Sequence, residues 1–572
     1  MRYACLACDF DGTIARDGIV SASTVDALRR LRSSGRKVIL ATGREIDDLR
    51  AVFPELGMFD RIVAENGGVL FRPGSGDRIR LGEPPSPAFI EELHRRGVQP
   101  LSVGNCVVAT WHPHEKTVLE VVRDMNLELH IIFNKGAVMV LPSGVNKGTG
   151  LEAALQELGL SAHNVVGVGD AENDHGFLTI CECSVAVGNA LPSIKERADW
   201  VTAGTHGSGV EELIADLLKN DLEELSPRLK RHEVALGNLE GGEQFALPVY
   251  GAGAGILVAG PSGQGKSTTV SAIVERLVEK KCQVCLFDPE GDYDEFKPLV
   301  ALGGPNQVPT SKEVLDVLAN PVQSVSVNLL GVPLADRPAA FKELLVPVQG
   351  LRGQKARPHW VVVDEAHHLL PRDSRESAAP SELYNFLLVT VNPDSVSPHF
   401  LRSCGGIIAV GQDPQTVIDQ FNNSVGREFQ FEAKTALRAQ PGKIMVWLSG
   451  NPSTPCYVKV KLADSELRRH KRKYAAGELG EDKSFYFRGA EGKLNLRAQN
   501  LNLFAQLAEG VDSETWAFHL SRRDYSKWLN EMVKDEELAR VVAEIETQKD
   551  LSPLASREKI IEAIRQHYTS AA

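Results

Sequence analysis

The sequence Asp9-Phe10-Asp11-Gly12-Thr13 follows directly on the apolar run CLAC at residues 5–8. Such a run predicts a buried β-strand, and residues two apart on a strand face the same side of the sheet. Asp9 and Asp11 are therefore expected to emerge together at the carboxyl end of this strand, where open α/β sheets bind ligands. Two carboxylates can share one Mg²⁺ ion there, and the Gly-Thr pair opens a loop whose backbone N–H groups suit a phosphate.

The pattern of strands continues through residues 1–218, where short Val/Ile/Leu-rich runs alternate with helical patterns. This alternation predicts βαβ units around a mainly parallel sheet. A second alternation of the same kind occupies residues 236–465, so we expect a multidomain α/β protein. The sequence further indicates a charged connector at residues 219–235, a basic linker at 466–477 and a mostly helical domain at 478–572.

The composition is that of a folded globular protein. A chain of 572 residues is long enough for about three to four domains. The 63 Lys and Arg against 75 Asp and Glu give a formal charge of −12, which excludes a general electrostatic attraction to nucleic acid or anionic membranes. The sequence has no apolar run of about 18 residues that would predict a membrane span. Nine scattered cysteines do not suggest a disulfide framework, so a cytoplasmic protein is expected.

Further motifs follow the first one in order. Thr42 stands in the motif ATGR after the second predicted strand, Lys147 begins a predicted helix in VNKGTGL, and VVGVGDAEND contains Asp170 and Asp174. This set resembles the haloacid dehalogenase superfamily of phosphatases over residues 1–218. The resemblance implies a Rossmann-like domain with its nucleophile at Asp9, general acid/base at Asp11, phosphate-binding hydroxyl at Thr42 and neutralising lysine at Lys147. Magnesium would be held by Asp9, the Asp11 carbonyl and Asp170, with Asp174 either a ligand or a supporting hydrogen-bond partner.

The chemistry agrees with these roles. An aspartate can attack phosphorus only when the repulsion between its charge and the phosphate is cancelled, which Mg²⁺ and Lys147 would do. Asp11 would carry a proton to the leaving alkoxide and then remove one from the hydrolytic water.

A lid is expected to be inserted between the Thr42 motif and Lys147. AENGG at residues 64–68 and THGSGVEEL at 205–213 resemble the Cof-like subfamily, which carries its cap at that place. We expect a small α/β cap at about residues 84–133, similar to those of phosphoglycolate and sugar-phosphate phosphatases. The substrate would be a small phosphorylated metabolite that the sequence does not name. His112 and His114 lie in the cap and could contact substrate, but a surface loop position is the simpler interpretation.

A nucleotide site is predicted in the second domain. An apolar run at residues 255–259 leads into GPSGQGKS at 260–267, which fits the phosphate-binding loop G-x-x-x-x-G-K-[ST] at every fixed position and precedes a helical pattern. The glycines let backbone N–H groups close around phosphates at the positive end of the helix. Lys266 should reach the β and γ phosphates, and the Ser267 hydroxyl should ligate Mg²⁺. The ATP-binding residues are expected to be Gly260, Gly263, Gly265, Lys266, Ser267 and Thr268.

Another apolar run, residues 359–363, ends in Asp364 and Glu365. We expect Asp364 to hold Mg²⁺ through water and Glu365 to polarise the attacking water. FDPEGDY at 287–293, DEAHHLLP at 364–371 and VGQDP at 410–414 together resemble the HerA and FtsK class of hexameric ATP-driven DNA translocases. The resemblance implies a RecA-like P-loop domain with Gln412 as the polar γ-phosphate sensor. The sequence shows no obvious basic pore loop, so ATP hydrolysis is expected, whereas DNA translocation does not follow.

The nucleotide site points to a homo-oligomer. Neither the phosphate-binding loop nor the segment around Asp364 contains an arginine that would stabilise charge on the γ-phosphate within one chain. We therefore expect a neighbouring subunit to supply it in a ring, a hexamer by resemblance to the class. Arg402 and Arg427 are candidates, although a surface position is the simpler interpretation of each.

Three other patterns have structural interpretations. The pairs Cys5/Cys8 and Cys282/Cys285 lie in predicted strands, where residues three apart face opposite sides, so buried small apolar residues are favoured over a zinc site. The run RRHKRK at 468–473 favours a solvated linker over a nucleic-acid patch. The Tyr- and Trp-rich middle of the last domain favours a small helical core over a base-stacking platform.

The leading hypothesis is a bifunctional enzyme, in which a Mg²⁺-dependent phosphomonoesterase is joined to an ATP-hydrolysing, oligomerising P-loop domain that regulates or assembles it. The alternative is a nucleic-acid motor, in a genome-defence setting, whose phosphatase domain processes phosphate ends or nucleotides. In a third hypothesis the P-loop only senses nucleotide and has negligible turnover.

Overall fold

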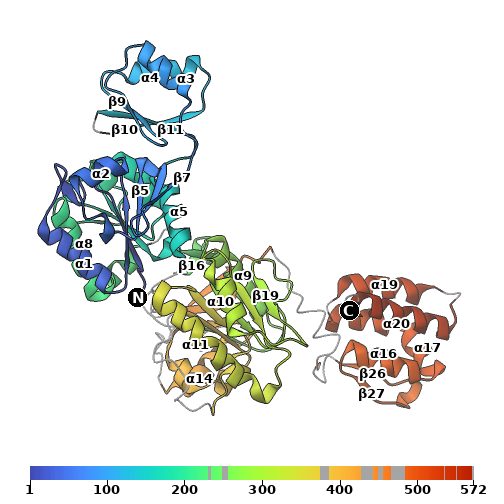
Figure 1. Cartoon of the computed structure of the whole chain (residues 1–572). Helices are drawn as coiled ribbons and strands as arrows, with labels where there is room; N and C mark the ends of the chain where they lie inside the picture. The colour runs from blue at the N-terminus through green and yellow to red at the C-terminus, as the bar shows by residue number, and fades with distance from the viewer. Residues whose placement is uncertain are drawn as a thin grey trace. The chain divides into compact units, whose positions relative to one another are not determined.

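The computed structural model describes residues 1–134, 136–229, 233–247, 255–373, 385–426, 442–448, 455–464, 479, 484–533, 535–548 and 551–569 (Figure 1). The chain divides into two compact units. The first contains Met1–Glu290 and Pro298–Asp464, and the second contains Gly291–Lys297 and Ser465–Ala572. In these described ranges, no helix has both the length and the apolar character needed to cross a bilayer.

The N-terminal sheet is built around β1 (Cys5–Cys8), all of whose residues are buried. β1 pairs in parallel with β4 (Lys37–Ala41) and β12 (Val165–Gly169), in a sheet of order β14-β13-β12-β1-β4-β5-β6-β7. The other strands are β5 (Arg61–Ala64), β6 (Val69–Arg72), β7 (Asp77–Arg80), β13 (Cys183–Ala186) and β14 (Trp200–Val201). The main helices are α1 (Ala22–Ser33), α2 (Ile46–Val52), α5 (Lys147–Leu158), α6 (His175–Ile180), α7 (Pro192–Lys195) and α8 (Gly207–Asn220).

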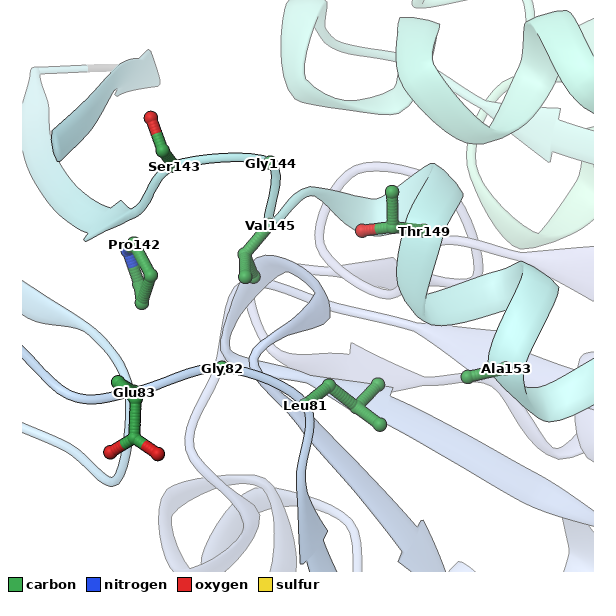
Figure 2. Close-up of a pocket in the computed structure, with 9 residues that line it drawn as sticks. All are labelled: Leu81, Gly82, Glu83, Pro142, Ser143, Gly144, Val145, Thr149 and Ala153. Carbon is green, nitrogen blue, oxygen red and sulfur yellow. The ribbon is translucent and has the colours of Figure 1, made fainter. Parts of the chain in front are cut away.

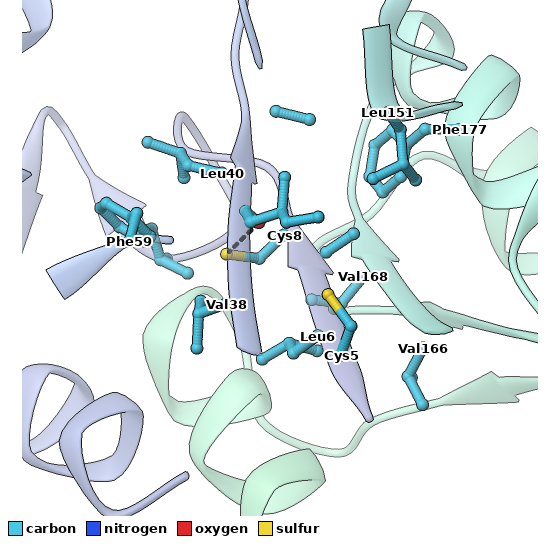
Figure 3. Close-up of a cluster of buried hydrophobic side chains, with 14 of the residues drawn as sticks. Cys5, Leu6, Cys8, Val38, Leu40, Phe59, Leu151, Val166, Val168 and Phe177 are labelled. Atoms are coloured by element: carbon cyan, nitrogen blue, oxygen red, sulfur yellow. Dashed lines mark hydrogen bonds between the residues drawn. The ribbon is translucent and has the colours of Figure 1, made fainter. Parts of the chain in front are cut away.

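The core of this domain is apolar on both faces of β1, as burial of a central parallel strand requires. Figure 3 shows Cys5 and Cys8 among Leu6, Leu40 and Val168. The Cys8 thiol donates to Ile39 O at 3.7 Å, and Cys5 and Cys8 are free and buried. The structure therefore confirms that this cysteine pair packs as small apolar side chains.

Helix α5 begins at Lys147 because Asn146 caps it. The Asn146 side chain accepts from the backbone N–H groups of Gly148 and Thr149, which have no partner within the helix. Gly159 ends the helix in the left-handed conformation with φ of 60°, as helix C-termini favour.

A four-stranded antiparallel sheet of order β10-β11-β9-β8 is inserted between β7 and α5. Helices α3 (Pro87–Arg95) and α4 (Glu115–Asp124) lie on one face of it (Figure 1). Their apolar side chains form one buried cluster with those of the sheet. The strands are β8 (Ser102–Val103), β9 (Val108–Trp111), β10 (Leu129–Asn134) and β11 (Ala137–Pro142). The boundary expected at residue 133 falls inside β10, so the insertion extends to Pro142. β11 resembles a core strand in sequence, and only its antiparallel pairing with β9 and β10 assigns it to the insertion.

The second sheet has eleven strands in the order β16-β15-β25-β24-β23-β17-β22-β21-β18-β20-β19. Its central strands β17 (Gly255–Ala259), β22 (Phe386–Thr390), β21 (Trp360–Val363) and β18 (Val284–Asp288) are parallel and fully buried. The other strands are β15 (Val234–Asn238), β16 (Gln244–Leu247), β19 (Val300–Gly303), β20 (Val325–Asn328), β23 (Cys404–Ala409), β24 (Ile444–Leu448) and β25 (Cys456–Val460). The helices are α9 (Lys266–Glu279), α10 (Ser311–Ala319), α11 (Arg337–Lys355), α12 (Ala366–Leu369), α13 (Pro398–Arg402) and α14 (Pro414–Val425).

The second unit contains a hairpin of β26 (Phe485–Phe487) and β27 (Leu496–Ala498) and five α-helices among its described residues. These are α16 (Leu501–Gly510), α17 (Ser513–Ser521), α18 (Asp524–Trp528), α19 (Glu536–Thr547) and α20 (Pro553–Thr569). Trp516 and Tyr525 are fully buried and stack with their ring centroids 4.3 Å apart. These rings form a core, as expected, and are not exposed for base stacking.

Candidate functional sites

Three carboxylates and one lysine meet at the carboxyl end of the N-terminal sheet. Asp9 follows β1, Asp170 follows β12, and Asp174 ends the short 3₁₀ helix η4 (Glu172–Asp174). One carboxylate oxygen from each residue lies within 4.8 Å of the others, and all three residues are buried. Lys147 Nζ donates to Asp9 Oδ1 and Asp174 Oδ1, at 2.6 Å each. Residues from distant motifs thus form one cluster.

This cluster fits a divalent cation. Burial, followed by the charge of Asp174, raises the pKa of Asp9 to about 8, although Lys147 opposes the shift. A hard cation such as Mg²⁺ prefers oxygen ligands and would stabilise the ionised carboxylates. Asp174 also accepts from the backbone N–H groups of Asp170 at 2.8 Å and Ala171 at 3.0 Å. It therefore holds the loop together, which is the supporting role that the sequence left open for it.

Asp11 follows the same strand as Asp9 and is bound by an arginine of the Thr42 motif. Arg44 binds its carboxylate through two hydrogen bonds, Nε to Oδ2 at 2.6 Å and Nη2 to Oδ1 at 2.8 Å. The strand pattern placed Asp9 and Asp11 on one face of the first strand. In the structure β1 ends at Cys8, so both acids lie in the loop beyond the strand. Arg44 was not singled out from the sequence, although it stands in the same motif as Thr42.

Two hydroxyl side chains lie at the same edge of the sheet. Thr42 follows β4, is fully buried, and accepts from the backbone N–H of Arg44 at 3.1 Å. Thr13 donates from Oγ1 to Asp170 Oδ1 at 3.2 Å. Since β1, β4 and β12 are parallel neighbours, these hydroxyl groups lie at the same edge of the sheet as the carboxylate cluster.

The loop between β17 and α9 curls around its own lysine. Lys266 Nζ donates to Gly260 O at 2.8 Å and Pro261 O at 3.1 Å. Ser267 Oγ is buried and has no hydrogen-bond partner in the part of the chain that the structure describes. A buried hydroxyl without a protein partner fits a ligand of Mg²⁺. A Cβ at Gly260 would lie 1.9 Å from Val410 O, so the close approach of these two loops requires glycine.

The remaining residues expected to bind the nucleotide lie in this loop and in the first turn of α9. Gly265 has φ of 101°, which favours glycine, immediately before α9. Gly263 and Thr268 are exposed, and so is Gln412, which follows β23. A Cβ at the neighbouring Gly411 would lie 3.2 Å from Pro261 Cδ, so the loop of Gln412 borders the phosphate-binding loop.

Asp364 and Glu365 follow β21 and are both buried. Glu365 has φ of 40°, a costly backbone conformation for a residue with a side chain, and its N–H donates to Asp364 Oδ1 at 3.0 Å. His367 Nδ1 lies 3.2 Å from Thr390 Oγ1 at the end of β22. Burial, followed by the charge of His368, lowers the pKa of His367 to about 4, so its ring is neutral at pH 7.

Two family models match this chain. Residues 6–94 and 104–214 match haloacid dehalogenase-like hydrolase, and residues 253–392 match the central domain of helicase HerA. A phosphoglycolate phosphatase of Methanothermobacter thermautotrophicus is 34% identical over 219 residues, which cover 36% of this chain and 96% of the relative. The chain belongs to the haloacid dehalogenase-like hydrolases. Its hydrolase domain is fused to a HerA-type ATPase domain.

Further similarities cover the same hydrolase domain. A phosphoglycolate phosphatase of Pyrobaculum aerophilum is 31% identical over 229 residues, which cover 38% of this chain and 97% of the relative. Among solved structures, a haloacid dehalogenase-like hydrolase from Bacteroides thetaiotaomicron is 20% identical, with 38% of this chain and 99% of that chain covered and a TM-score of 0.35.

In this hydrolase, Glu65 connects the core to the inserted four-stranded sheet, which is the region expected to form the cap. Its buried carboxylate accepts from the backbone N–H groups of Asn105 at 3.1 Å, Cys106 at 2.7 Å and Val107 at 3.2 Å. The next residue, Asn66, accepts from Asn173 Nδ2 at 3.0 Å beside the carboxylate cluster. Glu65 and Asn66 both have φ of 51°, so the backbone is strained where cap and core meet. Sequence reasoning used AENGG only to recognise the subfamily and missed this contact.

A cleft of about 590 Å³ is lined by both the cap and the core of the hydrolase. The cap lines it with His112, His130 and Ile132, and the core with Asn146 and Asn173. His112 is 63% exposed and pairs through Nδ1 with Glu115 at 2.9 Å. Its surface position agrees with the simpler interpretation, yet it also borders the cleft. His114 Nε2 lies 2.8 Å from Gln99 O.

A second pocket lies at the two chain crossings between core and cap (Figure 2). Leu81, Gly82 and Glu83 enter the cap, whereas Pro142–Val145 return from it and Thr149 and Ala153 belong to α5. A Cβ at Gly82 would lie 2.8 Å from Val145 Cγ2, so the crossings are closely packed. None of these residues belongs to the carboxylate cluster, and the pocket marks where the cap joins the core.

Arg402 and Arg427 are the candidates for the arginine expected from a neighbouring subunit. Arg402 Nε donates to Val425 O at 3.4 Å within its own domain. Arg427 and the run RRHKRK lie outside the residues that the structure describes.

Proposed function

We propose that the first domain hydrolyses a small phosphomonoester through an aspartyl-phosphate intermediate on Asp9. The observation that carries this proposal is the buried cluster in which Lys147 contacts both Asp9 and Asp174 at 2.6 Å. A buried ammonium group between carboxylates can have a purely structural role. Lys147, however, stands at a helix N-terminus and at the carboxyl edge of a parallel sheet, where anionic ligands bind.

The proposed reaction has two displacements. Asp9 Oδ attacks phosphorus, the bond to the ester oxygen breaks, and Asp11 donates a proton to the leaving alkoxide. Asp11 then takes a proton from water, whose oxygen attacks phosphorus and releases phosphate and Asp9. Lys147 and the Thr42 hydroxyl hold the phosphoryl oxygens. Mg²⁺, held by Asp9, the Asp11 carbonyl and Asp170 with Asp174 behind them, would neutralise the charge of nucleophile and phosphate.

The substrate class is a small phosphorylated acid or sugar. The named relatives are phosphoglycolate phosphatases, and the cleft between cap and core is lined by histidine and asparagine side chains that suit an anionic or hydroxylated substrate. A panel that includes phosphoglycolate and sugar phosphates, with Mg²⁺, identifies the preferred ester.

We also propose that the HerA-type domain hydrolyses ATP. Gly260, Gly263, Gly265, Lys266, Ser267 and Thr268 would bind the nucleotide. Ser267 and Asp364 would hold its Mg²⁺, Glu365 would orient the attacking water, and Gln412 would sense the γ-phosphate. A ring of identical chains, a hexamer by class, would supply the missing cation from a neighbour. On dilution, ATPase turnover per chain should then collapse while phosphatase turnover persists. A monomer with full ATPase activity would refute the ring.

Reciprocal variants test the two activities. Asp9→Asn should abolish phosphate release from an aryl phosphate and leave ATP hydrolysis intact, and Lys266→Ala should do the reverse. Asp47→Asn, which alters an exposed carboxylate in α2, is the control for the first variant. Phosphatase activity that survives in Asp9→Asn would rule out this nucleophile.

The match to the HerA central domain supports a second candidate, a nucleic-acid motor whose phosphatase domain processes phosphate ends or nucleotides. DNA-stimulated ATP hydrolysis at low salt, compared in chains with and without residues 468–473, tests it. Without stimulation, this candidate fails.

A further inference from the structure

Arg357 of the ATPase domain binds the end of a helix in the phosphatase domain. Both domains belong to the first compact unit. The guanidinium donates from Nε and Nη2 to Gly159 O, at 3.0 and 2.8 Å, and from Nη2 to Ala319 O at 2.8 Å. Nη1 donates to Leu318 O and to Gln283 Oε1, the latter at 3.0 Å. Arg357 is 1% exposed, so these contacts replace its hydration.

The acceptors explain why a cation is stable there. Gly159 caps the C-terminus of α5, and Leu318 and Ala319 end α10. The carbonyl groups at a helix C-terminus carry the negative end of the helix dipole. Arg357 therefore lies between the negative ends of two helices, one from each domain. Lys355 adds a second cation at the first of them, because its Nζ donates to Leu158 O at 2.7 Å.

The helix that Arg357 holds is the one that carries Lys147. α5 starts at Lys147 and is 12 residues long, about 18 Å. Its first residue contacts Asp9, and its C-cap contacts Arg357. In the ATPase domain, Arg357 stands shortly before β21, the strand that ends before Asp364 and Glu365. One helix and one short strand thus connect the two candidate sites.

A second connection runs beside the first. His163 Nε2 donates to Lys280 O at 2.6 Å, and Lys280 caps the C-terminus of α9, the helix that begins at Lys266. His163 is followed by Asn164, whose Oδ1 lies 3.1 Å from His359 Nε2 and whose Nδ2 donates to Ala356 O at 3.1 Å. Asn164 immediately precedes β12, the strand that leads to Asp170. The two contacts of Asn164 are buried, and the contact between His163 and Lys280 is partly buried.

We propose that Arg357 is a positioning residue of the phosphatase that the ATPase domain supplies. By fixing the C-terminus of α5, it sets the place of Lys147 against Asp9, so that the nucleotide state of the ATPase domain changes phosphatase kcat. This inference rests on the proposed phosphatase and ATPase activities. Helices are stiff along their axes, and a shift of about 1 Å at a catalytic group is enough to cost rate.

The test measures phosphatase kcat and KM of the full chain on an aryl phosphate with Mg²⁺, without nucleotide, with ADP and with a non-hydrolysable ATP analogue. The phosphatase kcat of the wild type should differ at least twofold between nucleotide states. Arg357→Met should lower kcat about tenfold with little change in KM and remove the nucleotide response. Arg357→Lys keeps the charge but can make fewer hydrogen bonds. It should recover part of the kcat and part of the nucleotide response.

Arg276→Met is the matched control. Arg276 is also a buried arginine that donates to backbone carbonyls, those of Ala272 and Lys461, but within the ATPase domain alone. It should leave phosphatase kcat and its nucleotide response unchanged. Lys355→Met serves as a second junction variant should Arg357→Met fail to fold, because Lys355 is less buried. Lys355→Met should lower kcat and weaken the nucleotide response in the same way, but by a smaller factor.

The outcomes separate this inference from the proposed function. A wild-type chain without phosphatase activity on any ester counts against the proposed function. An active wild type with unchanged kcat in the folded junction variants, or with no response to nucleotide, overturns the role of Arg357. An equal loss in Arg276→Met would show general destabilisation and would overturn it as well.

Discussion

At the scale of single residues, the pair of Asp11 and Arg44 holds the proposed acid/base in one orientation. Two hydrogen bonds from one guanidinium fix a carboxylate in a way that lysine cannot reproduce. We expect Arg44→Lys to lower kcat about tenfold for an alkyl phosphate and much less for an aryl phosphate, whose leaving group needs little protonation. Steady-state kinetics on the two esters measures the difference.

Arg78 offers a matched control, because it makes a similar two-bond pair with Asp47 at the surface. Arg78→Lys should leave both rates unchanged. If Arg44→Lys reduced both rates equally, Arg44 would bind the phosphate or stabilise the fold, and it would not orient the group that transfers the proton.

At the scale of elements, Glu65 anchors the cap segment 105–107 to the core. Hydrogen bonds to a charged group contribute about 1.5–3 kcal/mol each, and this carboxylate accepts three from backbone amides. Glu65→Ala should therefore raise KM several-fold and speed hydrogen exchange of these amides by about tenfold or more. Glu65→Gln should give an intermediate result. Mass spectrometry of deuterium uptake and initial-rate kinetics provide the two readouts.

Glu45 also connects core and cap, through Ser102 Oγ at 2.8 Å, but this contact is exposed. Glu45→Ala should have little effect, since exposed polar pairs contribute little. Unchanged exchange at residues 105–107 in Glu65→Ala would mean that other contacts hold the cap.

At the scale of the whole molecule, the junction between the two α/β domains should depend on pH through His163. Burial lowers the pKa of His163, but its hydrogen bonds to Cys282 and Glu182 outweigh this and raise the pKa to about 10. A group whose pKa is raised in the folded state stabilises that state. The contribution of His163 is complete below about pH 6.5 and is lost as the pH rises to about 10. The free energy of unfolding should fall over this window, by at most about 1.4 kcal/mol per pH unit from this group.

Urea unfolding at several pH values measures this dependence. His163→Gln should be less stable at pH 6.5 and should show a smaller decline toward pH 10 than the wild type. His94→Gln, at an exposed position, should retain the wild-type decline. Equal slopes in His163→Gln and the wild type would show that His163 does not titrate in this window.

The sequence by itself predicted the elements whose signals are local. A buried strand, a loop of defined glycine spacing and a capped helix start are each encoded within about ten neighbouring residues, because backbone conformation and short-range hydrogen bonds determine them. For this reason the residue pattern alone was enough to place the motifs of Asp9, Lys147 and Lys266 at a strand end or a helix start. The comparisons support the two families that these motifs indicated.

Only the tertiary structure decided what depends on contacts between distant residues. The turn of Asp11 toward Arg44, the assignment of β11 to the cap and the anchoring of the cap by Glu65 follow from packing that no periodicity encodes. Arg357 and Gly159 are 198 positions apart, and nothing in either segment indicates the other. A guanidinium binds any set of correctly placed carbonyl oxygens, so its partners are determined by where the folded chain brings helix ends together and not by a sequence motif.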